Sequence, residues 1–353
     1  MKPVIYTGKV HLGGSGIGHT AAHQVRPLIE LGLLERAYVL RATDEFAKDS
    51  IQVQLPSGLS YVAEDMLFDG VVALMSTGAR LLQSWLAHSL FTAQSHEYDF
   101  YVVNCFSAHI TEQRRLLEKY TGKQLVHPFS EKKVLRELEL ATHILAPSEF
   151  VFNTLRKHGL ADKAKIIPFG ADVEKFKPGE KEDDVFRVLF VGRNWVRKGL
   201  PYLLAAWSEL NLSNAELHIV GVSDEISERY RNVKAEEWAD DIVRTYQNAD
   251  IFCLPAIEDG CPLVTYEALA CGLPVIVSET TGTAQHIWNG ENGFVVETGR
   301  PDQLAEAIAY FYNNKEELEH MSRVARKTAL EWTWERFENS YGKWISEILS
   351  GSA

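Results

Sequence analysis

Residues 249–278 read ADIFCLPAIEDGCPLVTYEALACGLPVIVS, and this stretch decides the fold. Two short apolar runs, DIFCLPA (250–256) and PVIVS (274–278), flank the amphipathic segment PLVTYEALAC (262–271). Apolar runs of this length are typical of buried strands, and the segment between them has the composition and length of a helix. A strand, a helix and a second strand in this order predict a βαβ unit with a parallel sheet.

The same alternation runs through the rest of the chain. Amphipathic stretches such as HTAAHQVRPLIEL (19–31) and PDQLAEAIAYFYN (301–313) predict helices. The other predicted strands are VIYT (4–7), AYVLR (37–41), FYVVN (100–104), KQLV (123–126), HILA (143–146), KIIP (165–168), VFRVLFVG (185–192) and AELHIVG (215–221). This pattern predicts an α/β protein with doubly wound, Rossmann-like domains.

The segment PFGADVEKFKPGEKEDD (168–184) is rich in Pro, Gly and charge and lacks periodicity, so it predicts a domain boundary. We expect a first domain over residues 1–170 and a second over residues 171–333. Doubly wound domains bind ligands at the carboxyl ends of their strands. The polar residues that directly follow predicted strands are therefore the candidate site residues.

Composition narrows the class of protein. The chain has 353 residues, of which 46% are hydrophobic and 24% charged, and this is typical of a globular protein. No apolar run approaches the roughly 18 residues of a membrane span, and the N-terminus reads directly into strand-like sequence without a signal-peptide pattern. The cysteines form no C-x-x-C pair, which favours buried free thiols in a reducing cytoplasm. They are Cys105, Cys253, Cys261 and Cys271.

Charge is unevenly distributed along the chain, whose net charge is −12. Residues 1–170 hold 18 Lys and Arg against 17 Asp and Glu, whereas residues 171–353 hold 18 against 31. Nothing here resembles the broad basic stripe of a nucleic-acid-binding protein. In the acidic half, FVGRNWVRKG (190–199) nevertheless places Arg193 and Lys198 just after a predicted strand. An arginine fork and a lysine point charge could hold a diphosphate from two sides, and solvated turn residues are the alternative.

The stretch EDGCPLVTYEALACG contains the predicted start of a helix. Asp259 and Gly260 are expected to cap this helix, which would leave the backbone N–H groups of Leu263 and Val264 free to receive a phosphate. Glu267 falls about one turn further on, where its carboxylate could accept two hydroxyls of a ribose. The alternative is an ordinary amphipathic helix with a solvent-facing glutamate.

Two further features lie in the first half. The loop GGSGIGH (13–19) does not match G-x-G-x-x-G, but its glycines allow the backbone to approach a ligand closely; a flexible loop is the alternative. His109 and His127 both follow predicted strands, although a lone histidine is more often structural than catalytic. No metal-ligand spacing, G-x-S-x-G or P-loop pattern is present.

Taken together, these blocks resemble the retaining glycosyltransferases of family 4, which have the GT-B fold of two Rossmann-like domains facing across a cleft. The resemblance covers nearly the whole chain and has the blocks in the family's order. They are GGSGIG, APSEFVFNTLRKHG, KIIPFGADVEKFKP, FVGRNWVRKG, ADIFCLPAIEDGCPLVTYEALACGLPVIVS, ENGFVVETGRPDQLAEAI and EWTWERF. It also implies that the C-terminal helix, within residues 334–353, crosses back to the first domain.

The resemblance implies a metal-independent transfer of a sugar from a nucleotide-diphosphate sugar to an acceptor hydroxyl, with no cofactor. Glu267 resembles the second glutamate of the family's E-x7-E motif, which meets the donor ribose, and Asp259 stands where the family has the first. The implied catalytic residues are His127, Arg193, Lys198 and Asp259. The implied donor-binding residues are Gly14, Gly16, Arg193, Lys198, Asp259, Gly260, Leu263, Val264 and Glu267.

Partners and alternatives follow from the same resemblance. The acceptor would be a sugar, a glycan or a lipid-linked sugar, and the basic segment 112–136 would suit weak contact with an anionic membrane surface, with solvated helix faces as the alternative. Two other functions stay open. One is a non-catalytic nucleotide-sugar-binding protein, and the other is a GT-B sugar-nucleotide epimerase or phosphorylase.

Overall fold

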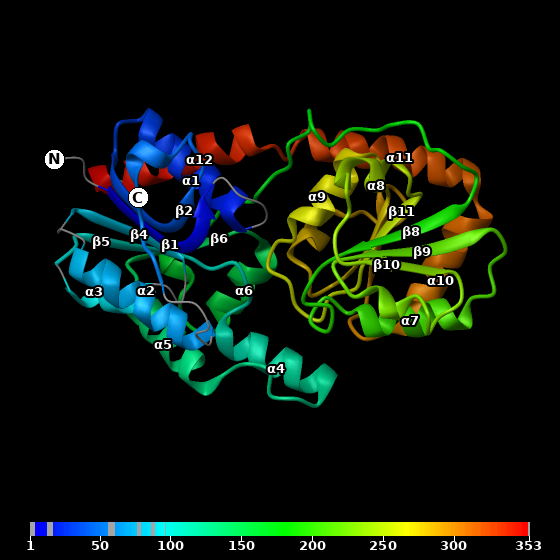
Figure 1. Ribbon diagram of the computed structural model, residues 1–353, viewed down its shortest axis with the longest axis horizontal. Coiled ribbons are helices and arrows are strands. Elements are labelled where there is room, and N and C mark those ends of the chain that lie inside the picture. The colour runs from blue at the N-terminus through cyan, green and yellow to red at the C-terminus, as the bar shows by residue number, and fades with distance from the viewer. Residues whose placement is uncertain are drawn as a thin grey trace.

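The computed structural model describes residues 4–12, 17–55, 61–75, 79–85, 89–95 and 97–351. The predicted site residues Gly14 and Gly16 lie outside these ranges. Within them the chain forms two parallel sheets covered by helices, which lie side by side in Figure 1.

The first sheet has seven strands in the order β3-β2-β1-β4-β5-β6-β7. Its strand order reverses between β1 and β4, as in doubly wound folds. The strands are β1 (Val4–Leu12), β2 (Leu34–Ala42), β3 (Ser50–Gln52), β4 (Leu81–Trp85), β5 (Phe100–Asn104), β6 (His143–Ala146) and β7 (Ala164–Ile166). The helices between them are α1 (Ile17–Glu30), α2 (Tyr61–Met75), α3 (Leu90–Ser95), α4 (Ile110–Thr121), α5 (Pro128–Leu140) and α6 (Glu149–Lys157).

The second sheet has six strands in the order β10-β9-β8-β11-β12-β13, and every pairing in it is parallel. Its strands are β8 (Phe186–Val191), β9 (Ala215–Val220), β10 (Val233–Glu236), β11 (Ile251–Leu254), β12 (Val275–Ser278) and β13 (Gly293–Val296). Its helices are α7 (Leu200–Glu209), α8 (Ile242–Gln247), α9 (Leu263–Ala270), α10 (Pro301–Asn313) and α11 (Lys315–Leu330). The βαβ unit predicted from residues 249–278 is confirmed as β11, α9 and β12.

One predicted strand is wrong. Residues 123–126 form no strand, because α4 ends at Gly122 in the left-handed conformation and His127 already caps α5, with Pro128 at its first position. The intervening residues are exposed except for Val126, and β5 pairs directly with β6, so the sheet has no place for another strand there. Conversely, β3, β4, β10 and β13, which have three to five residues each, were not predicted.

The last helix, α12 (Trp334–Ser350), returns to the first sheet and packs against α1. Figure 1 shows its red ribbon lying beside α1 at the side of the first sheet. Glu338 accepts hydrogen bonds from Arg26 at 2.7 Å and from His23 at 2.5 Å, and the His23 ring stacks on Trp334 with centroids 4.1 Å apart. The domain limits themselves, 1–170 with 334–353 and 171–333, stay a prediction.

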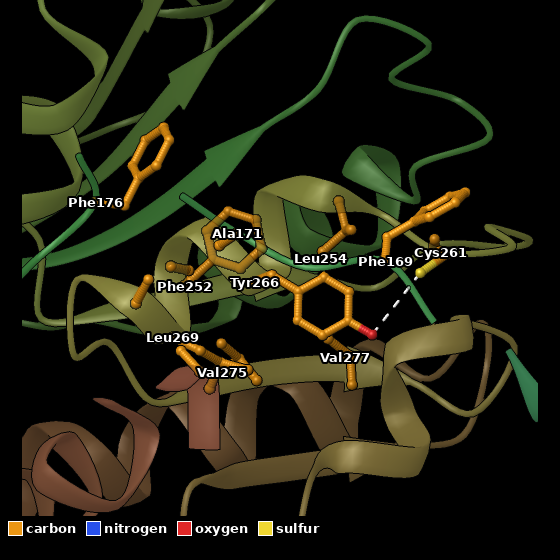
Figure 2. Close-up of a cluster of buried hydrophobic side chains, with 14 of the residues drawn as sticks. Phe169, Ala171, Phe176, Phe252, Leu254, Cys261, Tyr266, Leu269, Val275 and Val277 are labelled. Carbon is orange, nitrogen blue, oxygen red and sulfur yellow. Dashed lines mark hydrogen bonds between the residues drawn. The ribbon is translucent and has the colours of Figure 1, made fainter. Parts of the chain in front are cut away.

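The segment that joins the sheets is packed, despite its polar composition. Phe169, Ala171 and Phe176 are at most 6% exposed. They lie in the same apolar cluster as Tyr266 of α9 and Phe252 of β11 (Figure 2). Burial of these side chains removes apolar surface from water and holds the connecting segment against the second sheet.

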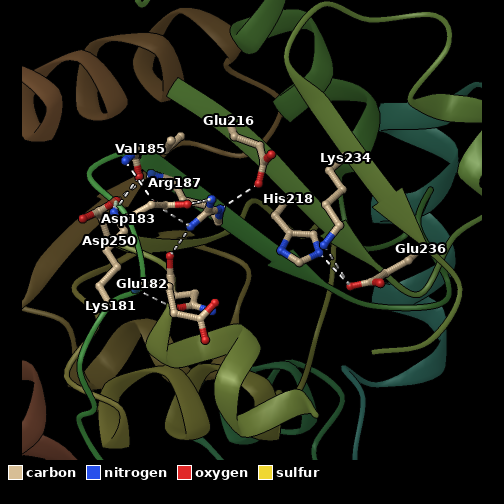
Figure 3. A network of polar contacts seen from close by, with 11 residues as sticks. Lys181, Glu182, Asp183, Val185, Arg187, Glu216, His218, Lys234, Glu236 and Asp250 are labelled. Atoms are coloured by element: carbon tan, nitrogen blue, oxygen red, sulfur yellow. Dashed lines mark hydrogen bonds and ion pairs between the residues drawn. The ribbon is translucent and has the colours of Figure 1, made fainter. Parts of the chain in front are cut away.

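A polar network holds the other end of this segment (Figure 3). Arg187 at the start of β8 donates to Glu216 of β9 at 2.7 Å and to Asp183 at 3.0 Å, and Lys181 pairs with Asp250. The Arg187 pKa is raised, because its carboxylate partners outweigh the opposing effect of burial. The connection is therefore anchored by apolar packing at one end and by ion pairs at the other.

Candidate functional site

The loop between β11 and α9 sets the centre of the candidate site. Helix α9 begins at Leu263 with Pro262 as its N-cap, and no side chain caps it. The expected cap by Asp259 and Gly260 is therefore wrong: three residues separate Asp259 from the first helical residue, and its carboxylate pairs with Lys198 instead. The first N–H groups of α9, including those of Leu263 and Val264, have no partner within the helix.

Two cations and two carboxylates meet where the loops after β8 and β11 come together. Lys198 donates to Asp259, and Arg197 donates to Glu258 at 2.9 Å, with its other end 4.0 Å from Asp259. Burial opposes the charge of Arg197, but Glu258 and Asp259 outweigh it and raise the Arg197 pKa. The four side chains are at most 22% exposed, so these ion pairs lie in a largely water-excluded place.

The Glu258 side chain contacts loops that belong to both sheets. Its side chain is fully buried and accepts hydrogen bonds from the Ala108 backbone N–H and the Gln113 amide, each at 2.8 Å. Both partners follow β5 of the first sheet. Arg197 adds a hydrogen bond to Ser107 at 3.2 Å, so this carboxylate and its arginine connect the two halves of the molecule.

Gly260 lies in the same contact between the halves. A Cβ atom built on Gly260 would be 2.0 Å from the Phe106 carbonyl oxygen, which only glycine permits at this position. The Gly260 carbonyl accepts a hydrogen bond from the Ser148 hydroxyl, the cap of α6, at 2.7 Å. Gly260 thus serves a close backbone approach, and its predicted donor contact remains untested.

Arg193 lines a pocket of about 530 Å³ formed after β8, β9 and β10, and Lys198 is not among the residues that line it. Its guanidinium carbon lies 3.7 Å from the ring centroid of Trp238, a cation–π contact. Trp195 and Trp238 line the pocket and are 44% and 66% exposed. Sequence reasoning missed both tryptophans, although Trp195 lies within the quoted FVGRNWVRKG.

Glu267 has the partner that a buried carboxylate requires. The Tyr246 hydroxyl, from α8, donates to its Oε2 at 2.9 Å. Burial raises the pKa of Glu267, while the Tyr246 hydrogen bond and the positive charge of Lys175 act in the opposite direction. This is not the fully solvent-facing glutamate of the alternative interpretation, and Tyr246, like the two tryptophans, is a residue that the sequence did not single out.

The two candidate histidines have local roles in the structure. His127 is exposed and caps α5, accepting a hydrogen bond from the Phe129 backbone N–H at 3.2 Å. In the described part of the chain it shares no hydrogen bond or ion pair with the other predicted site residues. His109 caps α4 and stacks on His158 with centroids 3.7 Å apart, and burial lowers its pKa to about 4. Because residues 123–126 form no strand, His127 does not follow one, contrary to the prediction.

A buried polar cluster lies where the first sheet's strand order reverses. The Gln24 side-chain oxygen accepts hydrogen bonds from Tyr6 and Trp85, both at 3.1 Å, and from Asn104 at 3.0 Å. Gln83 in turn donates to Asn104 at 2.9 Å. The signal that could have found this cluster is Asn104 itself, a polar residue at the end of the predicted strand FYVVN.

The basic segment of the first half is largely neutralised. Arg114 pairs with Glu131 at 3.0 Å and Arg136 with Glu139 at 2.7 Å, and Lys133 is buried against Asp69. These are the paired helix faces of the alternative interpretation. No helix in the described part of the chain is long and apolar enough to cross a membrane.

The last candidate groups are the cysteine thiols and the side chains that could bind a metal ion. The four cysteines are buried and free, as expected, and burial raises the pKa of Cys105 to about 12. Across the ranges that the structure describes, no three His, Cys, Asp or Glu side chains are grouped so as to hold a metal ion.

Part of the chain is similar to proteins that are already known. Residues 172–328 match the family model of glycosyl transferases group 1. The capsular polysaccharide biosynthesis glycosyltransferase CapM of Staphylococcus aureus is 28% identical over 239 residues, which cover 59% of this chain and 63% of CapM. The UDP-Gal:alpha-D-GlcNAc-diphosphoundecaprenol alpha-1,3-galactosyltransferase of Escherichia coli is 28% identical over 178 residues, or 43% of this chain and 46% of that protein. The chain thus spans less than two thirds of the length of both curated relatives.

Among solved structures, sucrose-phosphate synthase from Thermosynechococcus elongatus superposes with a TM-score of 0.79 at 18% identity, covering 100% of both chains. At that identity the likeness shows the fold alone, which is the predicted GT-B arrangement of two Rossmann-like domains. Membership of family 4 in particular stays a prediction. The chain thus has the GT-B fold, and its residues 172–328 match the model of glycosyl transferases group 1.

Proposed function

We propose that this protein is a retaining glycosyltransferase that moves a sugar from a nucleotide-diphosphate sugar to an acceptor hydroxyl. The observation that carries the proposal is that Arg193 and Lys198 follow β8 and that the N-terminus of α9 follows β11, two paired parallel strands of the second sheet, within the matched domain. Cations and free helix N–H groups at such an edge are suited to a diphosphate.

In this proposal, catalysis rests on charge that develops on the leaving diphosphate. As the bond to the sugar breaks, negative charge grows on the phosphate oxygen nearest the sugar. Preoriented donors at Arg193, Lys198 and the Leu263–Val264 backbone would stabilise that charge without a metal ion. Lys198 must first exchange its bond to Asp259 for a phosphate oxygen, which frees the Asp259 carboxylate for a hydroxyl of the transferred sugar.

Glu267 is assigned to the donor ribose. Its Oε2 is held by Tyr246, so the carboxylate is oriented before the ligand arrives, and its other oxygen can accept from a ribose hydroxyl. Retention of configuration would follow if the acceptor hydroxyl attacks from the face that the diphosphate leaves. The departing phosphate oxygen then takes the proton of that hydroxyl.

The test is a nucleotide-sugar binding and turnover assay with Arg193→Ala. A transferase that depends on this cation should lose roughly 100- to 1,000-fold in turnover, as enzymes do on loss of one charge-stabilising donor. Arg231→Ala, which removes an exposed arginine outside this pocket, is the matched control and should retain most turnover. Equal activity of both variants would contradict the assignment.

The same assay separates the alternatives and tests the absence of a metal. A non-catalytic binding protein would show donor affinity that falls in Arg193→Ala but no transfer or hydrolysis in either form. An epimerase would change the sugar without transferring it.

Turnover that survives a chelator supports metal independence, and turnover that is lost on chelation and regained with a divalent cation overturns it.

Acceptor binding is assigned to the first domain, with Gly14 and Gly16 near the diphosphate and His127 near the transferred sugar. By analogy with the lipid-linked acceptor named for the E. coli relative, we propose a sugar, glycan or lipid-linked acceptor. A His127→Ala variant tests the assignment of His127 to the transferred sugar. Unchanged turnover and unchanged sugar preference would remove His127 from the site.

Weak contact with an anionic membrane surface is a further part of the proposal. Leu125 and Phe129 are 46% and 38% exposed beside His127, and Lys123 and Lys132 have no ion-pair partner within the described ranges. Co-sedimentation with phosphatidylglycerol vesicles should fall in a Leu125→Ser, Phe129→Ser variant. No difference between this variant and the parent protein would contradict membrane contact at this loop.

A further inference from the structure

The pocket that contains Arg193 extends beyond what a diphosphate requires. It is lined by the loops after β8, β9 and β10, which are neighbouring parallel strands whose carboxyl ends meet at one edge. Its volume of about 530 Å³ and its two exposed tryptophans suit a flat aromatic ligand. Because Arg193 is assigned to the diphosphate, the pocket lies where the nucleoside of the same donor would extend.

The tryptophans explain affinity but not choice of base. Stacking on Trp195 or Trp238 would be favourable for any base, because every base has a π face. Hydrogen-bonding groups in the pocket must therefore decide which base binds. The side chains that could do so include two carboxylates, Glu225 and Glu237.

The two carboxylates differ in their surroundings. Glu225 faces Arg229 at 3.8 Å, whereas Glu237 is exposed and has no ion-pair partner in the ranges that the structure describes. A cationic ligand is disfavoured, since Arg193 and Arg229 line the same pocket. A carboxylate without an ion-pair partner, in a pocket that two arginines also line, is suited instead to a neutral group that presents hydrogen-bond donors.

We propose that the pocket selects guanine and that Glu237 reads its base edge. This inference rests on the proposed function, because it assigns the base of the same donor. Guanine presents two adjacent donors, the ring N1–H and the exocyclic amino group, which a carboxylate accepts as a pair. Uracil has a carbonyl on each side of its single N–H, and adenine has a bare ring nitrogen beside its amino group, so both place an acceptor against the carboxylate.

The experiment is calorimetric titration of the full chain with GDP, IDP, UDP and ADP. IDP differs from GDP only by lacking the exocyclic amino group, so it removes one of the two donors. A paired contact to a base edge typically discriminates by about tenfold or more. GDP should therefore bind at least about tenfold more tightly than IDP and more tightly than UDP and ADP.

Variants assign the discrimination to a residue. Glu237→Gln replaces one acceptor oxygen by an amide donor and should bring the affinities for GDP and IDP to within about threefold of each other. Glu225→Gln, at the carboxylate already paired with Arg229, is the matched control and should keep the preference. Because Glu237 is exposed, we expect its variant to melt at the same temperature as the parent protein.

The outcomes distinguish this inference from the proposed function. Tighter binding of UDP or ADP, equal binding of GDP and IDP, or a preference unchanged in Glu237→Gln would each overturn guanine selection and leave the glycosyltransferase proposal intact. No binding of any of the four nucleotides would overturn both.

Discussion

Lys198 and Asp259 show how the resting protein holds a cation that the proposed reaction needs. Their ion pair occupies the group assigned to the diphosphate, so donor binding must break it. Asp259 stands where the family motif has glutamate, and the side chain of aspartate is shorter by one methylene. The residue therefore has two assigned partners, the lysine in the resting protein and the transferred sugar in the complex.

This competition gives a prediction for Asp259→Asn. The amide cannot hold Lys198 as firmly, so nucleoside diphosphates without sugar should bind about two- to fivefold more tightly, the scale of one ion pair of about 0.5–1 kcal/mol. Transfer should be slower in the same variant, since the carboxylate that would contact the sugar is gone. Calorimetry and initial rates measure the two effects. Weaker nucleotide binding would show that Asp259 supports the diphosphate site instead of competing for Lys198.

Glu267 gives a prediction about pH. Burial raises its pKa above the ordinary value of 4.5, so the folded state binds the proton more tightly than the unfolded chain does. The stability of the parent protein should therefore decrease as the pH rises from about 4.5 through the raised pKa. Glu267→Gln stays neutral and can still accept from Tyr246, so it should gain stability relative to the parent protein across this interval.

Urea unfolding of both proteins between pH 4.5 and 8 measures that difference. A constant difference over the whole range would contradict the pKa shift. Donor affinity of the same variant should fall, because an amide accepts ribose hydroxyls less strongly than a carboxylate does. Stability and function are thus expected to change in opposite directions at Glu267.

At the scale of elements, the loop between β11 and α9 determines how closely the two sheets' loops approach. The Gly260 Cα leaves no room for a side chain, because the Phe106 carbonyl oxygen would lie 2.0 Å from a Cβ and backbone atoms cannot move aside as a side-chain end can. Helix α9 itself could be predicted from sequence, but the course of the loop before it depends on the first half of the molecule.

Gly260→Ala should therefore push the two loops apart. We expect loss of most transfer activity and a larger radius of gyration in small-angle scattering, with each sheet's secondary structure retained. Gly70→Ala is the control: this glycine of α2 has open space around its Cα, and alanine there should stabilise by up to about 1 kcal/mol. An active, compact Gly260→Ala protein would show that the close approach is not required.

At the scale of the whole molecule, Arg197 and Glu258 connect the halves through a buried ion pair. Glu258 also accepts from the Ala108 N–H and Gln113 of the first half, so both of its carboxylate oxygens have hydrogen-bond partners. Buried pairs of this kind are weak sources of net stability but strong sources of loss when one partner is removed.

A double-mutant cycle tests this connection. Glu258→Gln alone should cost about 3 kcal/mol in free energy of unfolding, because it leaves Arg197 poorly compensated. Arg197→Met alone should cost a similar amount, and the double variant should cost clearly less than the two combined. Chemical denaturation measures all three. Additive losses would show that the two side chains act independently.

The sequence by itself determined the two doubly wound halves, because strand runs, helical periodicity and turn residues are local patterns. It also indicated Arg193 and Lys198, which follow a strand, and Glu267, which lies about one turn into the helix after the predicted strand 250–256. The strand expected at 123–126 is wrong, because a short run forms a strand only where a sheet has room for it, and here β5 pairs directly with β6.

The tertiary structure alone decided which charges meet. Three contacts join residues that lie 45 to 150 positions apart in the chain. They are Lys198 with Asp259, Arg193 with Trp238, and the buried Glu258 with Ala108. No local pattern encodes such contacts, because they depend on how two sheets and their loops pack. The motifs thus identified the groups, and the packing of the two halves determined what each group holds.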